Sequence, residues 1–154
     1  MKLQATLAKI WLPALALVGG ALVFASVGHA DAPAGRFTIS NGSVSDNQTG
    51  LVWQQSDDGN TYAFAAAQTH CSSLGAGWRA PSMKELQTIV DETRVYPAID
   101  NNVFPTVSSV TTSGSCYQTS TVLAGSNISW IVCFDSGRPT YDNENDTYHV
   151  LCVH

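Results

Sequence analysis

The four cysteines of this chain constrain its fold more than any other feature. They are Cys71, Cys116, Cys133 and Cys152, and all of them follow an N-terminal stretch that has the pattern of an export signal. An even number of cysteines in a small exported chain is typical of a disulfide framework, whereas metal and redox sites are typical of intracellular proteins. Two disulfides are therefore expected, and the count alone leaves three pairings open.

Residues 1–30 have the three parts of a secretory signal. Lys2 and Lys9 supply the positive beginning, residues 10–24 are almost entirely apolar, and small residues around Ala30 precede a suitable cleavage point. An uncleaved membrane anchor is the alternative, but the apolar run is shorter than the roughly 20 residues that span a bilayer. We therefore expect an exported protein, periplasmic, surface-located or secreted, with no membrane segment after signal removal.

The charge balance argues against nucleic acid as a partner. The chain has a formal net charge of −5, and loss of the signal with its two lysines makes it −7. A nucleic-acid-binding surface needs clustered lysines and arginines. The cations that remain are scattered along the sequence: Arg36, Arg79, Lys84, Arg94 and Arg138. Residues 31–35 are expected to form a linker, and residues 36–154 are enough for a single domain.

The sequence of the first half of the domain predicts strands followed by helices. A strand is predicted at 36–40, and the runs on either side of the polar turn at 46–50 predict a hairpin. Apolar residues at helical spacing predict a helix over 62–73, capped by Thr61 and ended by Gly75, with Cys71 on its buried face.

A second helix is predicted at 83–91. Ser82 and Glu85 have the spacing of a capping box, in which each side chain accepts a hydrogen bond from the other's backbone N–H. Its expected buried residues are Leu86, Ile89 and Val90.

The second half of the domain is β-rich. Strands are predicted at 107–112, 115–118, 128–134 and 148–153, with a hairpin turn at 135–138. Short helices followed by many strands predict an α+β domain, in which the helices are segregated from an antiparallel sheet.

This order of elements resembles the Lcl C-terminal domain family of exported bacterial proteins. Several short sequence motifs carry the resemblance, and they occur in the same order as in the family over most of the domain. They are Arg36-Phe37-Thr38, residues 44–53 ending in Asn47-Gln48-Thr49-Gly50-Leu51-Val52-Trp53, Ala65-Ala66 with Cys71, Trp78-Arg79-Ala80-Pro81, Lys84-Glu85-Leu86, Pro97-Ala98-Ile99-Asp100, Phe104-Pro105, Trp130 to Gly137, and Val150 to Val153.

The resemblance implies a C-type-lectin-like fold, with two short helices on an antiparallel sheet, a loop-rich second half and two disulfides. In such a fold the disulfides are nested, with Cys71 joined to Cys152 and Cys116 joined to Cys133. It also implies a role in adhesion or surface recognition. Two departures weaken any carry-over of binding to sulfated polysaccharides: residues 109–112 lack the family's tryptophan, and no cation follows Cys152.

One acidic cluster, at Asp142, Glu144 and Asp146, is a candidate calcium site because its carboxylates alternate along the chain. It lacks the glycine and the distal glutamate of an EF-hand loop, and a solvated acidic loop is the favoured interpretation. Apart from calcium, no cofactor is expected.

The candidate ligand-binding residues are polar and aromatic side chains of the second half: Tyr117, Arg138, Tyr141, Asn143 and Asn145. Trp53, Trp78 and Trp130 are instead expected in the core. No nucleophile, zinc or phosphate-loop motif is present, so we expect no enzymatic activity. The leading hypothesis is an exported recognition or adhesion module that binds a glycan or protein through loops 112–146. A structural or assembly subunit, with a homo-oligomer, is the alternative.

Overall fold

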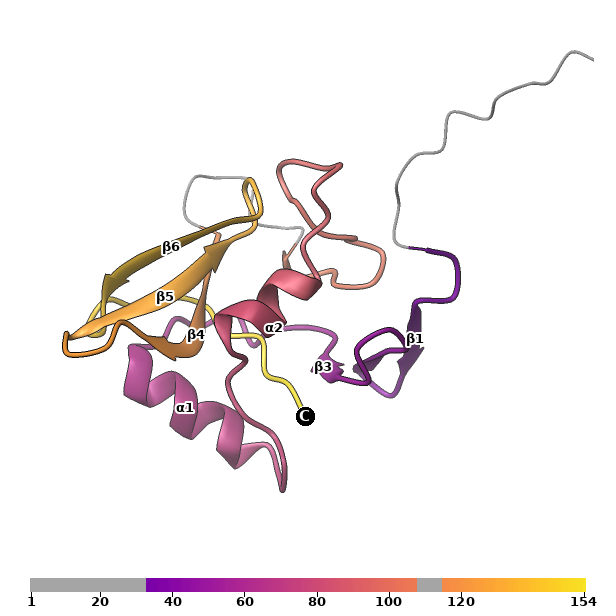
Figure 1. Ribbon diagram of the computed structural model, residues 1–154. Coiled ribbons are helices and arrows are strands. Elements are labelled where there is room, and N and C mark those ends of the chain that lie inside the picture. Colours follow the sequence, from indigo (N-terminus) through magenta and orange to yellow (C-terminus); the bar gives the residue numbers. More distant parts are fainter. Residues whose placement is uncertain (1–32, 108–114) are drawn as a thin grey trace, which may run out of the picture.

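The computed structural model describes residues 33–107 and 115–154. In these residues the chain forms an α+β fold with two helices and two separate three-stranded antiparallel sheets (Figure 1). The fold class agrees with the prediction, but the single sheet that was expected is divided in two.

The first sheet contains β1 (Phe37–Ser40), β2 (Ser43–Asp46) and β3 (Val52–Gln54), in that order. Asn41 and Gly42 form a two-residue turn between β1 and β2, with φ of 49° and 77°. Positive φ at both positions is typical of the type I′ turn, and asparagine followed by glycine tolerates it best. The predicted hairpin across residues 46–50 is confirmed by the pairing of β2 with β3.

Helix α1 spans Phe64–Ser73 and buries Ala67 and Cys71. The prediction of Thr61 as its N-cap is wrong, because the cap is Ala63 and no side chain caps this end. The preceding Tyr62 is instead held in a backbone bridge to Tyr148. Because this pairing holds Tyr62 outside the helix, α1 begins at Phe64 and not at Tyr62 as predicted.

Helix α2 spans Met83–Thr88 and is shorter than expected. Its predicted capping box is present, since Ser82 accepts from the Glu85 N–H and Glu85 accepts from the Ser82 N–H. Leu86 and Ile89 are buried as expected, whereas Val90, which was also expected to be buried, is half-buried.

The second sheet contains β4 (Cys116–Val122), β5 (Ile128–Cys133) and β6 (Arg138–Asn143), in that order. The predicted strand at 107–112 falls almost wholly outside the described residues, and Val107 itself is not in a strand. The predicted strand at 148–153 is only a series of isolated bridges. These bridges link the C-terminal segment to Tyr62, Tyr117, Trp53 and Arg79.

The C-terminal segment therefore holds the two halves of the fold together. The main core cluster draws residues from both sheets, from α2 and from this segment, and its largest members include Trp53, Leu86, Phe104, Tyr117, Phe134 and Leu151. A smaller cluster packs α1 against the same segment through Ala67, Cys71, Val150 and Cys152.

Two disulfides complete the framework, in the pairing that the family resemblance implies. Cys71 of α1 is joined to Cys152 of the C-terminal segment, and Cys116 of β4 is joined to Cys133 directly opposite on β5. The first bond closes 81 residues of sequence and the second closes 17.

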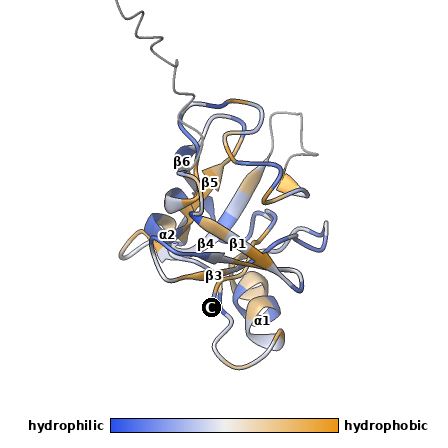
Figure 2. Cartoon of the chain, turned by 90° about the vertical axis from the view of Figure 1, so that its right-hand side faces the viewer, coloured by the Kyte–Doolittle hydropathy of each residue, from blue (hydrophilic) through white to orange (hydrophobic). Residues whose placement is uncertain are grey.

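Hydrophobic and hydrophilic residues are mixed along the strands and loops of the fold (Figure 2). Neither helix in the described part of the chain is long and apolar enough to cross a membrane.

Candidate functional site

Tyr117 cannot contact a ligand at the surface, which contradicts its prediction as a binding residue. Its side chain is fully buried and packs edge-on against Phe134, with ring centroids 5.3 Å apart. Its hydroxyl donates to the Asp57 carboxylate. Burial raises the pKa of Tyr117, and the hydrogen bond to Asp57 raises it further. Tyr117 therefore belongs to the core and anchors the loop that carries Asp57.

Strand β6 divides the other predicted binding residues between its two faces. Side chains alternate along a strand, so Tyr141 and Asn143 lie on one face and Arg138 lies on the opposite face with Asp142. Arg138 thus cannot contact the same compact ligand surface as Tyr141. The sequence had grouped these residues because they are close along the chain.

Tyr141 stands directly opposite Trp130 of β5. The two rings meet edge to face, with centroids 5.6 Å apart and planes at 75°. Tyr141 is 58% exposed and Trp130 is half-buried. We call the surface formed by Trp130, Tyr141 and Asn143 the aromatic face.

The prediction of a core position holds fully only for Trp53, which is completely buried, whereas Trp78 and Trp130 are both half-buried. The predicted hairpin turn at 135–138 could have shown which residue lies opposite Trp130. The register that this turn sets puts Trp130 across from Tyr141.

Asn143 is held at one end of the aromatic face. Its side-chain oxygen accepts from the Asn145 N–H at 2.9 Å, and its own N–H donates to Asp142 Oδ1 at 2.9 Å. The side-chain NH₂ group of Asn143 is therefore oriented, because the oxygen of the same amide is fixed. Asn145 contributes to this arrangement through its backbone and is exposed.

The acidic cluster does not form the calcium site that was considered. Asp142 Oδ2 accepts from the Tyr148 hydroxyl at 2.6 Å, and Oδ1 accepts from the Asn143 N–H. These hydrogen bonds lower the pKa of Asp142. Across residues 33–107 and 115–154, no three His, Cys, Asp or Glu side chains lie close enough to hold a metal ion. Asp142 and Asp146 lie close together beside Tyr148, but no third such side chain of the described residues joins them.

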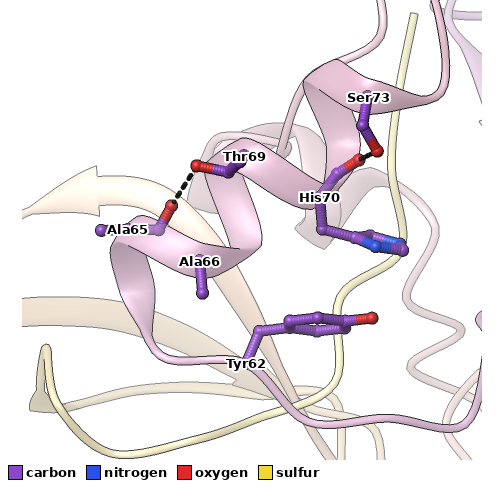
Figure 3. A pocket seen from close by; sticks show the side chains of 6 residues that line it. All are labelled: Tyr62, Ala65, Ala66, Thr69, His70 and Ser73. Atoms are coloured by element: carbon purple, nitrogen blue, oxygen red, sulfur yellow. Dashed lines mark hydrogen bonds between the residues drawn. The ribbon is translucent and has the colours of Figure 1, made fainter.

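A concave feature lies elsewhere, against helix α1 (Figure 3). This hollow has a volume of about 520 Å³ and is lined by Tyr62, Ala65, Ala66, Thr69, His70 and Ser73. The rings of Tyr62 and His70 are stacked at its side, with centroids 4.5 Å apart. No sequence pattern marks this hollow, since most of the residues that line it are small and form no motif.

A comparison with protein families identifies the family of this chain. The family model of the Lcl C-terminal domain matches residues 42–154. The chain belongs to this family. The match includes all four cysteines, both helices and every described strand except β1, so the Lcl C-terminal domain accounts for nearly the whole described fold. A search of curated proteins gives no significant match.

Proposed function

We propose that this Lcl C-terminal domain is an exported, non-enzymatic recognition module that binds a glycan through the aromatic face. The observation that carries the proposal is the pairing of exposed Tyr141 with Trp130 on adjacent strands. The face of an aromatic ring carries partial negative charge and attracts the C–H groups of a sugar ring. The oriented amide of Asn143 adds a hydrogen-bond donor beside the rings.

The absence of a spare thiol supports a non-enzymatic role. The sequence has four cysteines, and all of them are in disulfides. Cysteine-dependent chemistry therefore has no free nucleophile in the oxidised protein.

We extend the proposal to a C-type-lectin-like arrangement of the fold. Its support is the nested pair of disulfides, with the longer one joining the first helix to the last segment. The disulfides are also compatible with passage through an oxidising compartment. Together with the apolar signal-like stretch at 10–24, they support export of the protein.

The proposal is tested by a glycan array with the oxidised protein, run with calcium and again with a chelator. We expect a saturable hit that the chelator leaves unchanged, because the acidic residues do not converge on a metal site. The Tyr141→Ala variant should weaken binding about fivefold to 150-fold, in line with the loss of about 1–3 kcal/mol for a central aromatic contact.

Tyr96→Ala is the matched control, since Tyr96 is a similarly exposed tyrosine, at 63%, outside the aromatic face. Unchanged binding of Tyr141→Ala, or an equal loss in Tyr96→Ala, would refute this face as the site. An array without hits would instead favour the alternative function, a structural or assembly subunit that binds proteins.

A further inference from the structure

The hollow against α1 is a second candidate site, distinct from the aromatic face. It runs along the exposed surface of the helix, where Ala65 and Ala66 leave space that larger side chains would fill. In Figure 3 the Tyr62 and His70 rings lie one above the other at its side, with the two side chains pointing the same way. The hollow thus has an apolar floor and one aromatic wall.

The side-chain hydroxyls of the hollow can act only as acceptors toward a ligand. The Thr69 hydroxyl donates to the Ala65 carbonyl at 3.1 Å, and the Ser73 hydroxyl donates to the His70 carbonyl at 2.7 Å (Figure 3). A hydroxyl has a single proton, so both groups have only lone pairs left. A ligand that uses these groups must bring its own donors.

The carboxylate of Asp58 lies at the tips of the Tyr62 and His70 side chains. Asp58 Oδ2 accepts from the Tyr62 hydroxyl at 2.5 Å and lies 3.9 Å from His70 Nε2. Burial opposes the ionised form, but the hydrogen bonds from Tyr62 and Asn60 outweigh it and lower the pKa of Asp58 to about 2. Asp58 is therefore a negative charge at neutral pH. Its Oδ2 accepts from the Asn60 amide as well as from Tyr62, whereas its Oδ1 accepts only from the Asn60 N–H and has room for a further donor.

Among the residues that the structure describes, Asp58 forms no ion pair with a lysine or arginine. Three of the described arginines are engaged elsewhere, in the pairs Arg36 with Asp46, Arg79 with Glu85, and Arg94 with Asp91. The imidazole of His70 is the ion-pair partner that the described residues provide for Asp58. Asp58 thus offers a carboxylate to an incoming cation beside the apolar floor.

We propose that this hollow binds a lysine or arginine side chain of a basic partner polypeptide. The aliphatic part of such a side chain packs on Ala65 and Ala66, and its charged end extends along the Tyr62 and His70 rings to Asp58. Other N–H groups of the partner can donate to the hydroxyl lone pairs of Thr69 and Ser73. A second copy of this chain is a poorer occupant, because two such acidic chains repel one another.

The test is a titration of the oxidised protein with a hexalysine peptide, followed by NMR of the backbone amides. We expect the largest shifts in α1 and at Asp58. Ala66→Leu fills the hollow without disturbing the helix, since Ala66 is exposed and leucine is a good helix former. This variant should bind at least tenfold more weakly.

Asp58→Asn removes the charge but keeps an oxygen for the hydrogen bond from the Asn60 N–H. We expect about fivefold weaker binding, the effect of losing one partly exposed charge pair. Glu92→Gln is the charge-matched control, because Glu92 is exposed and far from α1 in sequence, and it should leave the affinity unchanged.

Several outcomes would overturn the proposal. They are no binding of hexalysine, equal losses in Asp58→Asn and Glu92→Gln, or full binding by Ala66→Leu. Self-association that replaces peptide binding would show a second copy as the occupant. Binding of an amine-bearing glycan in place of the peptide would also contradict it. None of these results depends on the aromatic face, which is tested with glycans and with Tyr141→Ala.

Discussion

At the scale of single residues, the pair of Glu85 and Arg79 makes the stability of the fold depend on pH. The Arg79 guanidinium donates to both carboxylate oxygens of Glu85, at 2.8 and 2.6 Å. These hydrogen bonds, with the Ser82 N–H, lower the pKa of Glu85 to about 2. Because the folded state holds this carboxylate ionised, its contribution is complete above the ordinary value of 4.5 and is lost as the pH falls toward 2.

We predict that Glu85→Gln lowers the free energy of unfolding by about 1 kcal/mol at pH 7, since Arg79 is half-exposed and solvent weakens the pair. Glutamine can still complete the capping box, so the variant isolates the charge. The difference from the parent should shrink between pH 4.5 and 2 in urea denaturation. Glu92→Gln serves as the control, and a difference that stays constant with pH would contradict the assignment.

Tyr117 and Trp130 show why exposure is hard to predict for a single residue. Both lie in strands, and the sequence placed the tyrosine outside and the tryptophan in the core. The structure has Tyr117 fully buried and Trp130 half-buried. Strand periodicity tells which residues share a face, but only the packing of other elements decides which part of that face is covered.

At the scale of elements, β6 is the free edge of the second sheet. The Glu144 N–H donates to the Asn127 carbonyl, so alternation along the strand points the N–H groups of residues 139, 141 and 143 away from β5. Pro139 has no N–H, and the Asn143 N–H is taken by Asp142 Oδ1. Tyr141 therefore has the one N–H on this edge that can still pair with another strand.

With so few free N–H groups, β6 is protected against pairing with a strand of another molecule. We predict that the double variant Pro139→Thr with Asp142→Val self-associates more strongly than the parent, because it restores two outward N–H groups and removes a charge. Analytical ultracentrifugation over a range of concentrations measures the effect. Thr140→Val, whose N–H faces β5, is the matched control, and equal behaviour of both variants would argue against edge protection.

The local sequence rules succeeded for elements whose partners are close along the chain. The capping box of α2 and the hairpin of β2 and β3 are both confirmed, since their hydrogen bonds lie within a few residues. The start of α1 and the strand at 148–153 were predicted incorrectly. Both depend on the bridge between Tyr62 and Tyr148, whose residues are far apart in sequence.

At the scale of the whole molecule, the two disulfides constrain the unfolded chain by very different amounts. The bond between Cys71 and Cys152 closes 81 residues, and the bond between Cys116 and Cys133 closes 17. The chain-entropy model gives about 4.5 kcal/mol for the longer loop and about 3 kcal/mol for the shorter. Both members of the longer bond are also fully buried in the smaller core cluster.

We predict that Cys71→Ala with Cys152→Ala destabilises the protein more than Cys116→Ala with Cys133→Ala. The expected difference in the free energy of unfolding is at least about 1.5 kcal/mol, since removal of the longer bond also loosens α1 from the C-terminal segment. Urea denaturation of the two oxidised double variants measures it. Equal losses would mean that loop length does not govern their contribution.

By itself the sequence determined the family, the α+β class, the even set of bridged cysteines and the local capping and turn elements. These depend on residue identity and on contacts over a few positions. The tertiary structure alone decided the division into two sheets and the bridges by which the C-terminal segment connects them. It also decided that Tyr141 lies beside Trp130 and that Asp58 lies beside His70. The reason is physical: burial and convergence of side chains depend on long-range packing, which local sequence patterns do not encode.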